Sequence, residues 1–470
     1  MSSRKFNEYK GLDLPQLGRE VLEVWDRENT FGRSITEREG APAFIFYEGP
    51  PSANGLPGIH HVLSRTIKDT ICRYKTQQGY LVRRKAGWDT HGLPVELGVE
   101  KKLGITKEDI GHKISIEEYN RTCREAVMEF TGVWEELTRK MGYWVDMKHP
   151  YITYENKYIE TLWWMLKQLF DKGLLYKGYT IQPYSPAAGT GLSNHELNQP
   201  GCYRDVKDTT CTAQFEIIRD ERSEFLFDDA QGTLYFLAWT TTPWTLPSNT
   251  ALAVGDNIEY VRVKCLNPYT QQPQTVILAK ELLPAYFTPK MEGTYSIGER
   301  IYKGSELVGI RYRQLIDWVK PMGDAFRVIS GDYVTTVDGT GIVHIAPTFG
   351  ADDDRVGKQA GIVPMYVVDR AGKNQPMVDR RGRLFRIEDM DPDFVAKYVD
   401  AERYREWAGR FVKNAYDPSL GPDDPTLDID IAVMLKGEGK AFKIEKHTHS
   451  YPHCWRTDKP VLYYLSLIHI

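Results

Sequence analysis

Three features that mark other protein classes are missing from this 470-residue sequence. It has six cysteines with no CxxC pair among them, so we do not expect a disulfide framework. No apolar run approaches the roughly 18 residues that a membrane span needs. The opening segment, MSSRKFNEYKGLDLPQLGRE, lacks the apolar core of a secretory signal. We therefore expect a cytoplasmic protein with reduced thiols and no membrane contact.

An excess of positive charge is missing as well. The formal net charge is −4, which argues against a generally basic coat for nucleic acid, although a local basic surface can still hold one strand. Hydrophobic residues make up 41% and charged residues 26% of the chain, as in an ordinary globular protein. At 470 residues the chain exceeds the size at which one core keeps growing, so we expect two or more domains.

The sequence does contain a pattern of strand, turn and helix. An apolar strand is predicted at 43–47, and it stops at Pro50 and Pro51 because proline cannot continue a central ladder. After the turn SANGLPG, apolar residues recur at helical spacing from Ile59 to a predicted helix end at Gly79. A second short strand, YLVRR, follows. This order favours an α/β fold that begins with a parallel nucleotide-binding sheet.

Other stretches divide the chain further. An amphipathic helix is predicted over 14–31, and residues 100–172 look helical. The last part of that stretch has an apolar face that we expect to lie in a core, and we expect packing roles for Trp163 and Trp164. From about residue 198, short apolar runs separated by turn residues predict a β-rich, barrel-like domain. A linker-like stretch at 417–425 ends that domain.

Two adjacent histidines, His60 and His61, stand in the first turn of the helix predicted from Ile59. A helix N-terminus offers unpaired N–H groups and a partial positive charge, so polyphosphate can bind there. Imidazoles in that turn can donate to phosphate oxygens as negative charge builds during a displacement. The alternative is a surface helix start with two solvated histidines, and these residues alone leave both interpretations open.

The segments around the histidines carry a family resemblance. GPPSANG at 49–55, followed by GWDTHGLPVE at 87–96, resembles class I aminoacyl-tRNA synthetases, and among them the isoleucyl family. The resemblance implies the first half of a class I Rossmann nucleotide-binding fold. It also implies ATP as a substrate with Mg²⁺, and L-isoleucine and tRNA(Ile) as partners.

The same resemblance assigns roles to residues. His60 and His61 would be catalytic, Asp89 would hold the α-ammonium group of the amino acid, and His91 would orient the same loop. A carboxylate at the end of a strand also suits an ammonium group on charge grounds. The residues implied for the ATP and adenylate site are Gly49, Pro50, Pro51, Asn54, Gly55 and Gly58.

One signature departs from the family pattern, which reads His, any residue, Gly, His. This chain has Gly58, Ile59, His60 and His61 there, so the first and third positions are exchanged. A histidine in third place would crowd the purine unless the loop shifts, which Gly58 and Pro57 would permit. We hypothesise that the exchange retains ATP activation and weakens inhibitors shaped to the usual loop.

A second candidate site lies in the β-rich part. Thr240, Thr241 and Thr242 follow an apolar strand, and DGTGIVHIAPTFGADDD places His344 and Asp353 near the start of a helix. Alone, threonines are common strand residues and acidic residues are common helix caps. Both segments nevertheless resemble the editing domain inserted in isoleucyl, valyl and leucyl synthetases. The resemblance implies that Asp353 grips the α-ammonium of a misattached amino acid, the threonines contact the terminal adenosine, and His344 lines the pocket.

Editing of Val-tRNA(Ile) has a physical reason. One missing methylene is worth only about 1–3 kcal/mol in a hydrophobic pocket, a limit for which isoleucyl enzymes are themselves the standard example. A second, smaller pocket that admits valine and refuses isoleucine removes the error. The interpretation that the motif resemblance favours is therefore an isoleucine–tRNA ligase with editing. The alternatives are an editing-only aminoacyl-tRNA deacylase, a tRNA-binding module, or a scaffold without activity.

The resemblance also suggests an organisation for the chain. We expect an N-terminal helical extension at 1–42, a first Rossmann half with the start of the insertion at 43–198, an editing domain at 199–425 and a return segment at 426–470. The family's KMSKS loop is missing, so we expect an N-terminal portion that does not activate isoleucine alone and a parent that is a monomer. Cys454 is the one thiol left of the family's zinc knuckles, so we expect no structural zinc.

Overall fold

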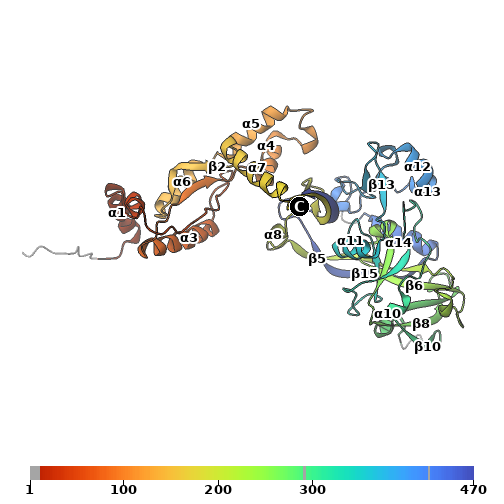
Figure 1. Ribbon diagram of the computed structural model, residues 1–470. Helices are drawn as coiled ribbons and strands as arrows, with labels where there is room; N and C mark the ends of the chain where they lie inside the picture. The colour runs from red at the N-terminus through yellow and green to blue at the C-terminus, as the bar shows by residue number, and fades with distance from the viewer. Residues whose placement is uncertain (1–10, 289–292, 422–423, 470) are drawn as a thin grey trace, which may run out of the picture. The chain divides into compact units, whose positions relative to one another are not determined.

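A computed structural model describes residues 11–288, 293–421 and 424–469 of the chain (Figure 1). The chain divides into two compact units, Met1–Tyr176 and Lys177–Ile470. The division falls inside the stretch that the sequence assigns to the first Rossmann half. Each unit is described by itself below.

The first unit is mainly helical around a small parallel sheet. Strand β1 pairs with β2 in parallel, and an isolated parallel bridge joins Ala43 to Leu81. The elements are α1 (Leu14–Arg27), α2 (Thr30–Thr36), α3 (Ile59–Gln77), β1 (Lys85–Trp88), α4 (Leu93–Leu103), η1 (Lys107–Asp109), α5 (Ile116–Val127), α6 (Thr131–Lys140), β2 (Asp146–Ile152) and α7 (Asn156–Asp171). The order of strand, helix and strand predicted near the N-terminus is present only in part: the predicted strand YLVRR is wrong, because only Leu81 makes a bridge and β1 starts directly after it at Lys85.

Two further predictions of secondary structure need correction. The predicted strand 43–47 is wrong, because only Ala43 makes a bridge and the following residues have no strand assignment. The prediction of helix throughout 100–172 is also wrong, because β2 interrupts it. Strand β2 has the sequence DMKHPYI, in which polar residues and a proline hide the apolar alternation that marks a strand.

Helix α3 is confirmed, and it ends just before Gly79, whose φ is +91°. Its apolar stripe, however, is not covered within the unit. The exposed fractions are 82% for Ile59, 64% for Leu63 and 54% for Ile67. The buried side of the helix instead carries Arg65, Cys72 and Thr76.

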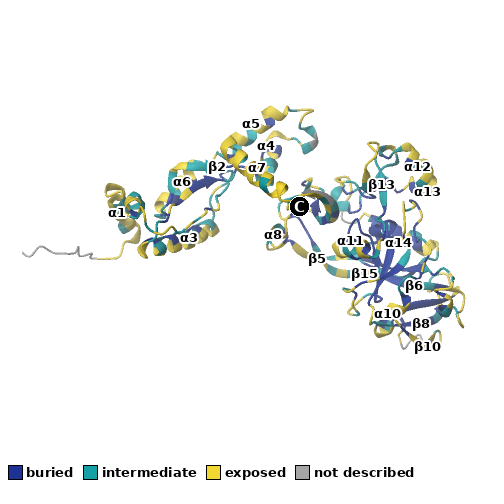
Figure 2. Cartoon of the chain, in the orientation of Figure 1, coloured by how far each residue is buried: buried dark blue, intermediate teal, exposed yellow. Residues whose placement is uncertain are grey.

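Helix α7 shows the same contrast between periodicity and burial. It forms over Asn156–Asp171, close to the predicted range, but none of its residues is buried (Figure 2). Trp163 and Trp164 are 67% and 64% exposed, so the predicted packing roles are wrong for this chain. Periodicity predicted the helix and its apolar face correctly, but it could not say whether anything covers that face.

The second unit is β-rich, as the sequence predicts. Its largest sheet has the order β10-β8-β9-β6-β5-β15, and a second sheet has the order β11-β7-β12. These strands are β5 (Tyr203–Glu216), β6 (Thr233–Thr240), β7 (Ala251–Val254), β8 (Glu259–Leu266), β9 (Pro273–Ala279), β10 (Ser296–Lys303), β11 (Arg327–Ser330), β12 (Ile342–Ile345) and β15 (Ala441–Pro452). The predicted barrel stays a prediction, because the strands group into separate sheets of six and three.

Smaller elements surround these two sheets. The remaining strands are β3 (Lys177–Ser185), β4 (Thr190–Gly191), β13 (Tyr366–Val368), β14 (Asn374–Pro376) and β16 (Leu462–His469). The helices are α8 (Asn194–Leu197), η2 (Glu224–Leu226), η3 (Pro243–Ser248), η4 (Lys280–Leu282), α9 (Leu283–Tyr286), α10 (Gly304–Leu307), α11 (Ala351–Ala360), η6 (Ile387–Asp389), α12 (Pro392–Tyr398), α13 (Ala401–Tyr404), η7 (Asn414–Tyr416) and α14 (Leu427–Gly437). Across the described ranges of both units, no helix is long and apolar enough to cross a membrane.

One continuous core joins the sheets of the second unit. It contains Phe215 of β5, Phe236 of β6 and Leu252 of β7, all completely buried. Helix α14 packs on β5 and on η3, the turn that follows β6. The segment directly after the three threonines, η3, is therefore held between β5 and α14.

A close approach in this unit gives a stability prediction. Gly341 has φ +73°, and a Cβ added to it would lie 2.4 Å from the Cβ of Ala279. Gly372 has the same φ, but a Cβ there would meet nothing within 4 Å. We expect Gly372→Ala to cost about 1–2 kcal/mol for the left-handed backbone alone. We expect Gly341→Ala to cost about 1–3 kcal/mol more because it also overpacks. Thermal unfolding of both variants checks this, and equal losses would contradict it.

Candidate functional site

The loop 49–58 is held in place by residues far along the chain. The indole N–H of Trp134, in α6, donates to the carbonyl of Gly55 at 2.9 Å. The backbone N–H of Asp89, just after β1, donates to the carbonyl of Pro51 at 3.0 Å. Ala53 is completely buried against Trp134 in a small apolar cluster. The structure thus brings the glycine-rich turn next to the strand end that carries Asp89.

His61 caps its own helix. The N–H of Gly58 donates to Nδ1 of His61 at 2.9 Å, so the neutral ring carries its hydrogen on Nε2. Burial, and then the neighbouring His60, lower the pKa of His61 below its usual value. The two imidazole rings lie 3.8 Å apart, and His60 is exposed. A neutral ring whose free Nε2–H faces away from the cap can donate one hydrogen bond to a ligand.

The exchanged order of glycine and histidine places the ring of His60 close to Gly58. A Cβ at Gly58 would lie 2.8 Å from Cε1 of His60, so the ring of His60 occupies space that the glycine leaves free. Gly58 itself has extended backbone with φ −102°, which any residue adopts. The reason for glycine here is therefore the close imidazole and not the backbone conformation.

Asp89 and His91 lie together after β1. The N–H of His91 donates to Oδ1 of Asp89 at 3.3 Å, and Nδ1 of His91 lies 2.7 Å from the hydroxyl of Thr153. The same hydroxyl accepts the N–H of Thr90 at 2.9 Å. Within the described residues Asp89 has no cationic partner, so its carboxylate is free to bind one.

Sequence reasoning missed three residues of this site. Glu48 is buried and contacts Lys68 and the hydroxyl of Tyr143, directly before Gly49. Trp134 and Thr153 hold the turn and the Asp89 loop as described above. None of the three stands in a motif, and each of them contacts a residue more than sixty positions away, so local pattern carried no signal for them.

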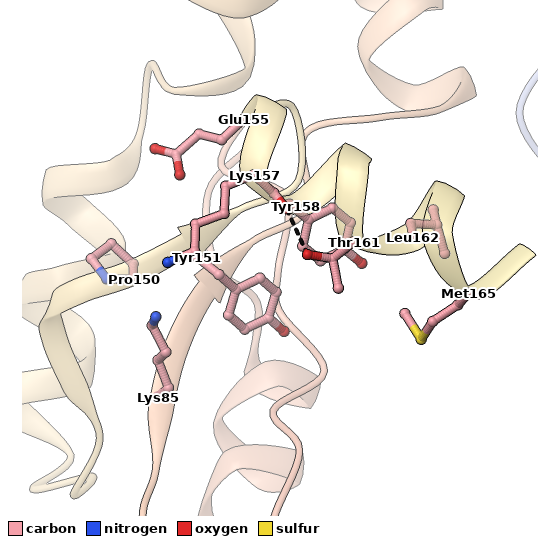
Figure 3. A pocket seen from close by; sticks show the side chains of 9 residues that line it. All are labelled: Lys85, Pro150, Tyr151, Glu155, Lys157, Tyr158, Thr161, Leu162 and Met165. Carbon is pink, nitrogen blue, oxygen red and sulfur yellow. Dashed lines mark hydrogen bonds between the residues drawn. The ribbon is translucent and has the colours of Figure 1, made fainter. Parts of the chain in front are cut away.

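A cavity of about 330 Å³ lies between β2 and α7 in the same unit. Figure 3 shows the side chains of Lys85 and Lys157 pointing into this space, with the rings of Tyr151 and Tyr158 beside it. Those two rings stack at 5.9 Å. None of the residues predicted for the nucleotide site lines this cavity.

The second unit contains a cavity of about 290 Å³ at the end of β6. Three of the predicted residues line it, namely Thr240, Thr241 and His344. Thr242 is not in its wall, but its N–H donates to the hydroxyl of Thr240 at 3.0 Å. The other lining residues are Trp239, Tyr333, Thr335, Asp338, Gly339, Thr340, Gly341, Ile342 and Val343. Sequence reasoning did not single out Trp239 or Tyr333, whose aromatic rings form part of the wall.

His344 is buried and fixed in one tautomer. The hydroxyl of Thr245 donates to the carbonyl of Thr242 at 2.8 Å, so it can only accept from Nε2 of His344 at 2.9 Å. Nδ1 of His344 then keeps its lone pair, and this atom is buried without a partner. Burial lowers the pKa of His344 to about 4, so the ring is neutral at pH 7.

Asp353 stands in the first turn of α11, next to the cavity wall. Its Oδ2 accepts the N–H of Ala346 at 2.8 Å, and the hydroxyl of Tyr333 lies 3.5 Å from Oδ1. Burial raises the pKa of Asp353 to about 6. In the part of the chain that the structure covers, no lysine, arginine or histidine pairs with this carboxylate. A partly desolvated carboxylate without a cation is suited to bind an ammonium group.

Metal binding has no candidate residues in the described ranges. No group of three or more His, Cys, Asp or Glu side chains there is placed to hold an ion. Cys454 is buried in a small apolar cluster with Leu192, Leu197 and Val461.

Comparison with known proteins gives consistent results. A family model described as tRNA synthetases class I (I, L, M and V) matches residues 20–405. The curated isoleucine–tRNA ligase of Bacteroides fragilis is 64% identical over 98% of this chain and 41% of its own length. Those of Porphyromonas gingivalis and Clostridium tetani are 63% and 43% identical, over 98% and 97% of this chain and 41% and 38% of theirs.

The chain therefore spans about 41% of the length of the first relatives it matches. Among solved structures, GlLeuRS-CP1 gives a TM-score of 0.33 at 14% identity, over 51% of this chain and 99% of that one. That score is too low to support an argument about fold. The family match spans most of the chain and includes both candidate sites, and the chain belongs to the class I tRNA synthetases (I, L, M and V).

Proposed function

We propose that this chain is a portion of an isoleucine–tRNA ligase that activates L-isoleucine with ATP and Mg²⁺, transfers it to tRNA(Ile), and hydrolyses Val-tRNA(Ile). The observation that carries the proposal is the identity of 64% to an isoleucine–tRNA ligase over 98% of this chain. Residues 43–198 would supply the first half of the Rossmann domain, and 199–425 the inserted, barrel-like editing domain. The protein would work in the cytoplasm, as a monomer when full length.

In the first unit, the turn 49–58 would bind ATP and the adenylate. His61 would donate from Nε2 to a phosphate oxygen, because its Nδ1 is engaged with Gly58. His60, on the exposed side, would add a second donor. Asp89 would bind the α-ammonium of isoleucine, and His91 would keep that loop in place through Thr153. The exposed apolar stripes of α3 and α7 would be covered by further polypeptide of the complete enzyme.

In the second unit, the cavity at the end of β6 would be the editing pocket. Asp353 would bind the α-ammonium of valine, and Thr240 to Thr242 would contact the terminal adenosine of the tRNA. His344 would line the pocket as a neutral ring. The ester would then be attacked by a positioned water, with the ribose hydroxyls of the tRNA assisting.

Hydrolysis of the mischarged tRNA tests the proposal directly. We expect the 470-residue chain to hydrolyse Val-tRNA(Ile) at least roughly tenfold faster than Ile-tRNA(Ile), because the extra methylene has no room in the pocket. Release of labelled amino acid from each tRNA measures this. Equal rates for the two, or no release above the spontaneous rate, would remove the proposed function.

Replacing the carboxylate should separate activity from stability. Asp353→Asn removes the charge that an ammonium needs, so we expect kcat/KM for Val-tRNA(Ile) to fall on the order of 100-fold. The folded pKa of about 6 lies above the usual 3.8, so ionised Asp353 weakens the folded state at pH 7 by at most about 3 kcal/mol. We therefore expect Asp353→Asn to melt no lower than the wild type at pH 7. If Asp353→Asn lost activity because it unfolds, this would contradict the role of Asp353 in binding.

The same carboxylate should set the pH dependence of editing. As pH falls through about 6, Asp353 takes up a proton and loses its attraction for ammonium. We expect kcat/KM for Val-tRNA(Ile) to fall about tenfold per pH unit below that value. The residual hydrolysis by Asp353→Asn serves as the control, since it should lack this step. A wild-type profile that stays flat down to pH 5 would contradict the assignment.

The tautomer of His61 is open to direct measurement. We expect NMR of labelled histidine side chains to show Nε2–H in the neutral form and a His61 pKa below 6.5. His60→Ala should raise that pKa, because it removes a neighbouring positive charge. A hydrogen on Nδ1 in the neutral ring, or a pKa that does not move, would argue against the geometry.

A further inference from the structure

A buried group of charges lies next to the segment that follows Thr240–Thr242, which we call the threonine peptide, in the second unit. Nζ of Lys413 lies 3.0 Å from Oδ2 of Asp208 and 3.5 Å from Oδ2 of Asp428. The side chains of Lys413 and Asp428 are only 11% and 3% exposed. His449 contacts the same oxygen of Asp208 at 3.3 Å, and Tyr451 lies under the ammonium group at 4.8 Å. Nothing in the proposed editing chemistry uses these residues.

The group joins four parts of the unit that are distant in sequence. Asp208 belongs to β5, His449 to β15 and Asp428 to the first turn of α14, while Lys413 directly precedes η7. Burial raises the pKa of Asp428 to about 6, and the charge of Lys413 opposes that rise. Buried ion pairs of this kind are weak sources of stability, because desolvation offsets their attraction. Their presence therefore needs another physical reason.

Asp428 has a second contact that supplies such a reason. Its Oδ1 accepts the backbone N–H of Trp244 at 2.8 Å, and both groups are buried. Trp244 is the second residue of η3, which starts directly after Thr242. Without the carboxylate oxygen this N–H would be buried and unpaired. A buried unpaired N–H destabilises the fold, whereas an exposed N–H would bind water instead.

The residues on both sides of Trp244 reach the cavity. On one side, Thr242 donates its N–H to the hydroxyl of Thr240, which lines the cavity. On the other side, the hydroxyl of Thr245 accepts from Nε2 of His344, also in the wall. The anchor at Trp244 therefore lies between the two contacts that set the position of the threonine peptide and of the histidine ring.

We propose that Asp428, held by Lys413, is a positioning residue of the editing pocket that fixes residues 240–245 through the N–H of Trp244. This inference rests on the proposed function of the pocket for its kinetic consequence. The structural part, namely the anchoring of the peptide, does not depend on that function. Lys413 keeps the carboxylate charged and oriented, and the ladder of β5 with β15 holds Asp208 beside it.

Three substitutions at one position separate the acceptor from the charge. Asp428→Asn keeps an oxygen acceptor for Trp244 and removes the charge, whereas Asp428→Val removes the acceptor as well. Asp428→Glu keeps the charge and moves the oxygens by one methylene. The matched control is Asp379→Val, because Asp379 also accepts backbone N–H groups and pairs with a cation, Arg383, away from this cavity.

The first measurement is amide hydrogen exchange of the peptide that spans 240–248, in the whole 470-residue chain. We expect exchange there to be about tenfold or more faster in Asp428→Val and Asp428→Glu, and within about threefold of wild type in Asp428→Asn. Asp379→Val should lower the melting temperature without changing exchange in this peptide. Unchanged protection in Asp428→Val would overturn the proposal, as would equal loss in Asp379→Val. Asp428→Glu answers the question if Asp428→Val does not fold.

The second measurement is hydrolysis of Val-tRNA(Ile) by the same variants. We expect kcat/KM to fall about tenfold or more in Asp428→Val and Asp428→Glu, to recover to within about threefold in Asp428→Asn, and to be unchanged in Asp379→Val per folded molecule. A wild-type chain that hydrolyses no mischarged tRNA removes the proposed function, while the exchange experiment still decides on the anchor. An active wild type whose Asp428→Val is equally active overturns the positioning role alone.

Discussion

The second unit depends on one pairing, the antiparallel ladder of β5 with β15. It runs from Tyr203 opposite Pro452 to Ala213 opposite Ala441, so it brings together residues more than two hundred positions apart. The entropy of closing so long a loop grows only slowly with length, which makes the pairing affordable once the intervening residues pack a core of their own. Everything between these strands then folds as a closed insertion, with α14 resting on β5 beside the end of β6. The cavity, the threonine peptide and the Asp428 anchor all belong to the stretch of chain that this pairing closes.

Local pattern predicted some elements well and others poorly, for physical reasons. Helices α3 and α11 carry strong local signals, namely apolar spacing that ends at glycine and acidic residues in a first turn. Strand β2 carries none, because DMKHPYI is half polar and gains its order from pairing with β1, sixty positions earlier. In α7 the apolar periodicity predicted the helix correctly. It could not predict whether another part of the protein packs on the apolar face, because periodicity depends on the helix alone.

The candidate sites divide in the same way. Motif resemblance singled out the turn 49–58, Asp89, the threonines and His344 as candidates because their residue types sit at fixed spacings. The contacts that orient them could not be predicted, because each joins segments with no local relation. The indole of Trp134 holds Gly55, the hydroxyl of Thr153 holds His91, and Asp428 holds Trp244 across 184 positions. A sequence shows which groups can do chemistry, but their supporting contacts exist only once the chain has folded.

Two buried carboxylates of the second unit have similarly raised pKa values in different surroundings. Burial raises the pKa of both Asp353 and Asp428 to about 6. Asp428 has its cation in Lys413, so its oxygen remains a charged, fixed acceptor for a backbone N–H. Asp353 accepts the N–H of Ala346 and lies 3.5 Å from the hydroxyl of Tyr333, and no cation of the described chain pairs with it. Asp353 is therefore a desolvated carboxylate next to a cavity of about 290 Å³ without the compensating cation that Asp428 has in Lys413.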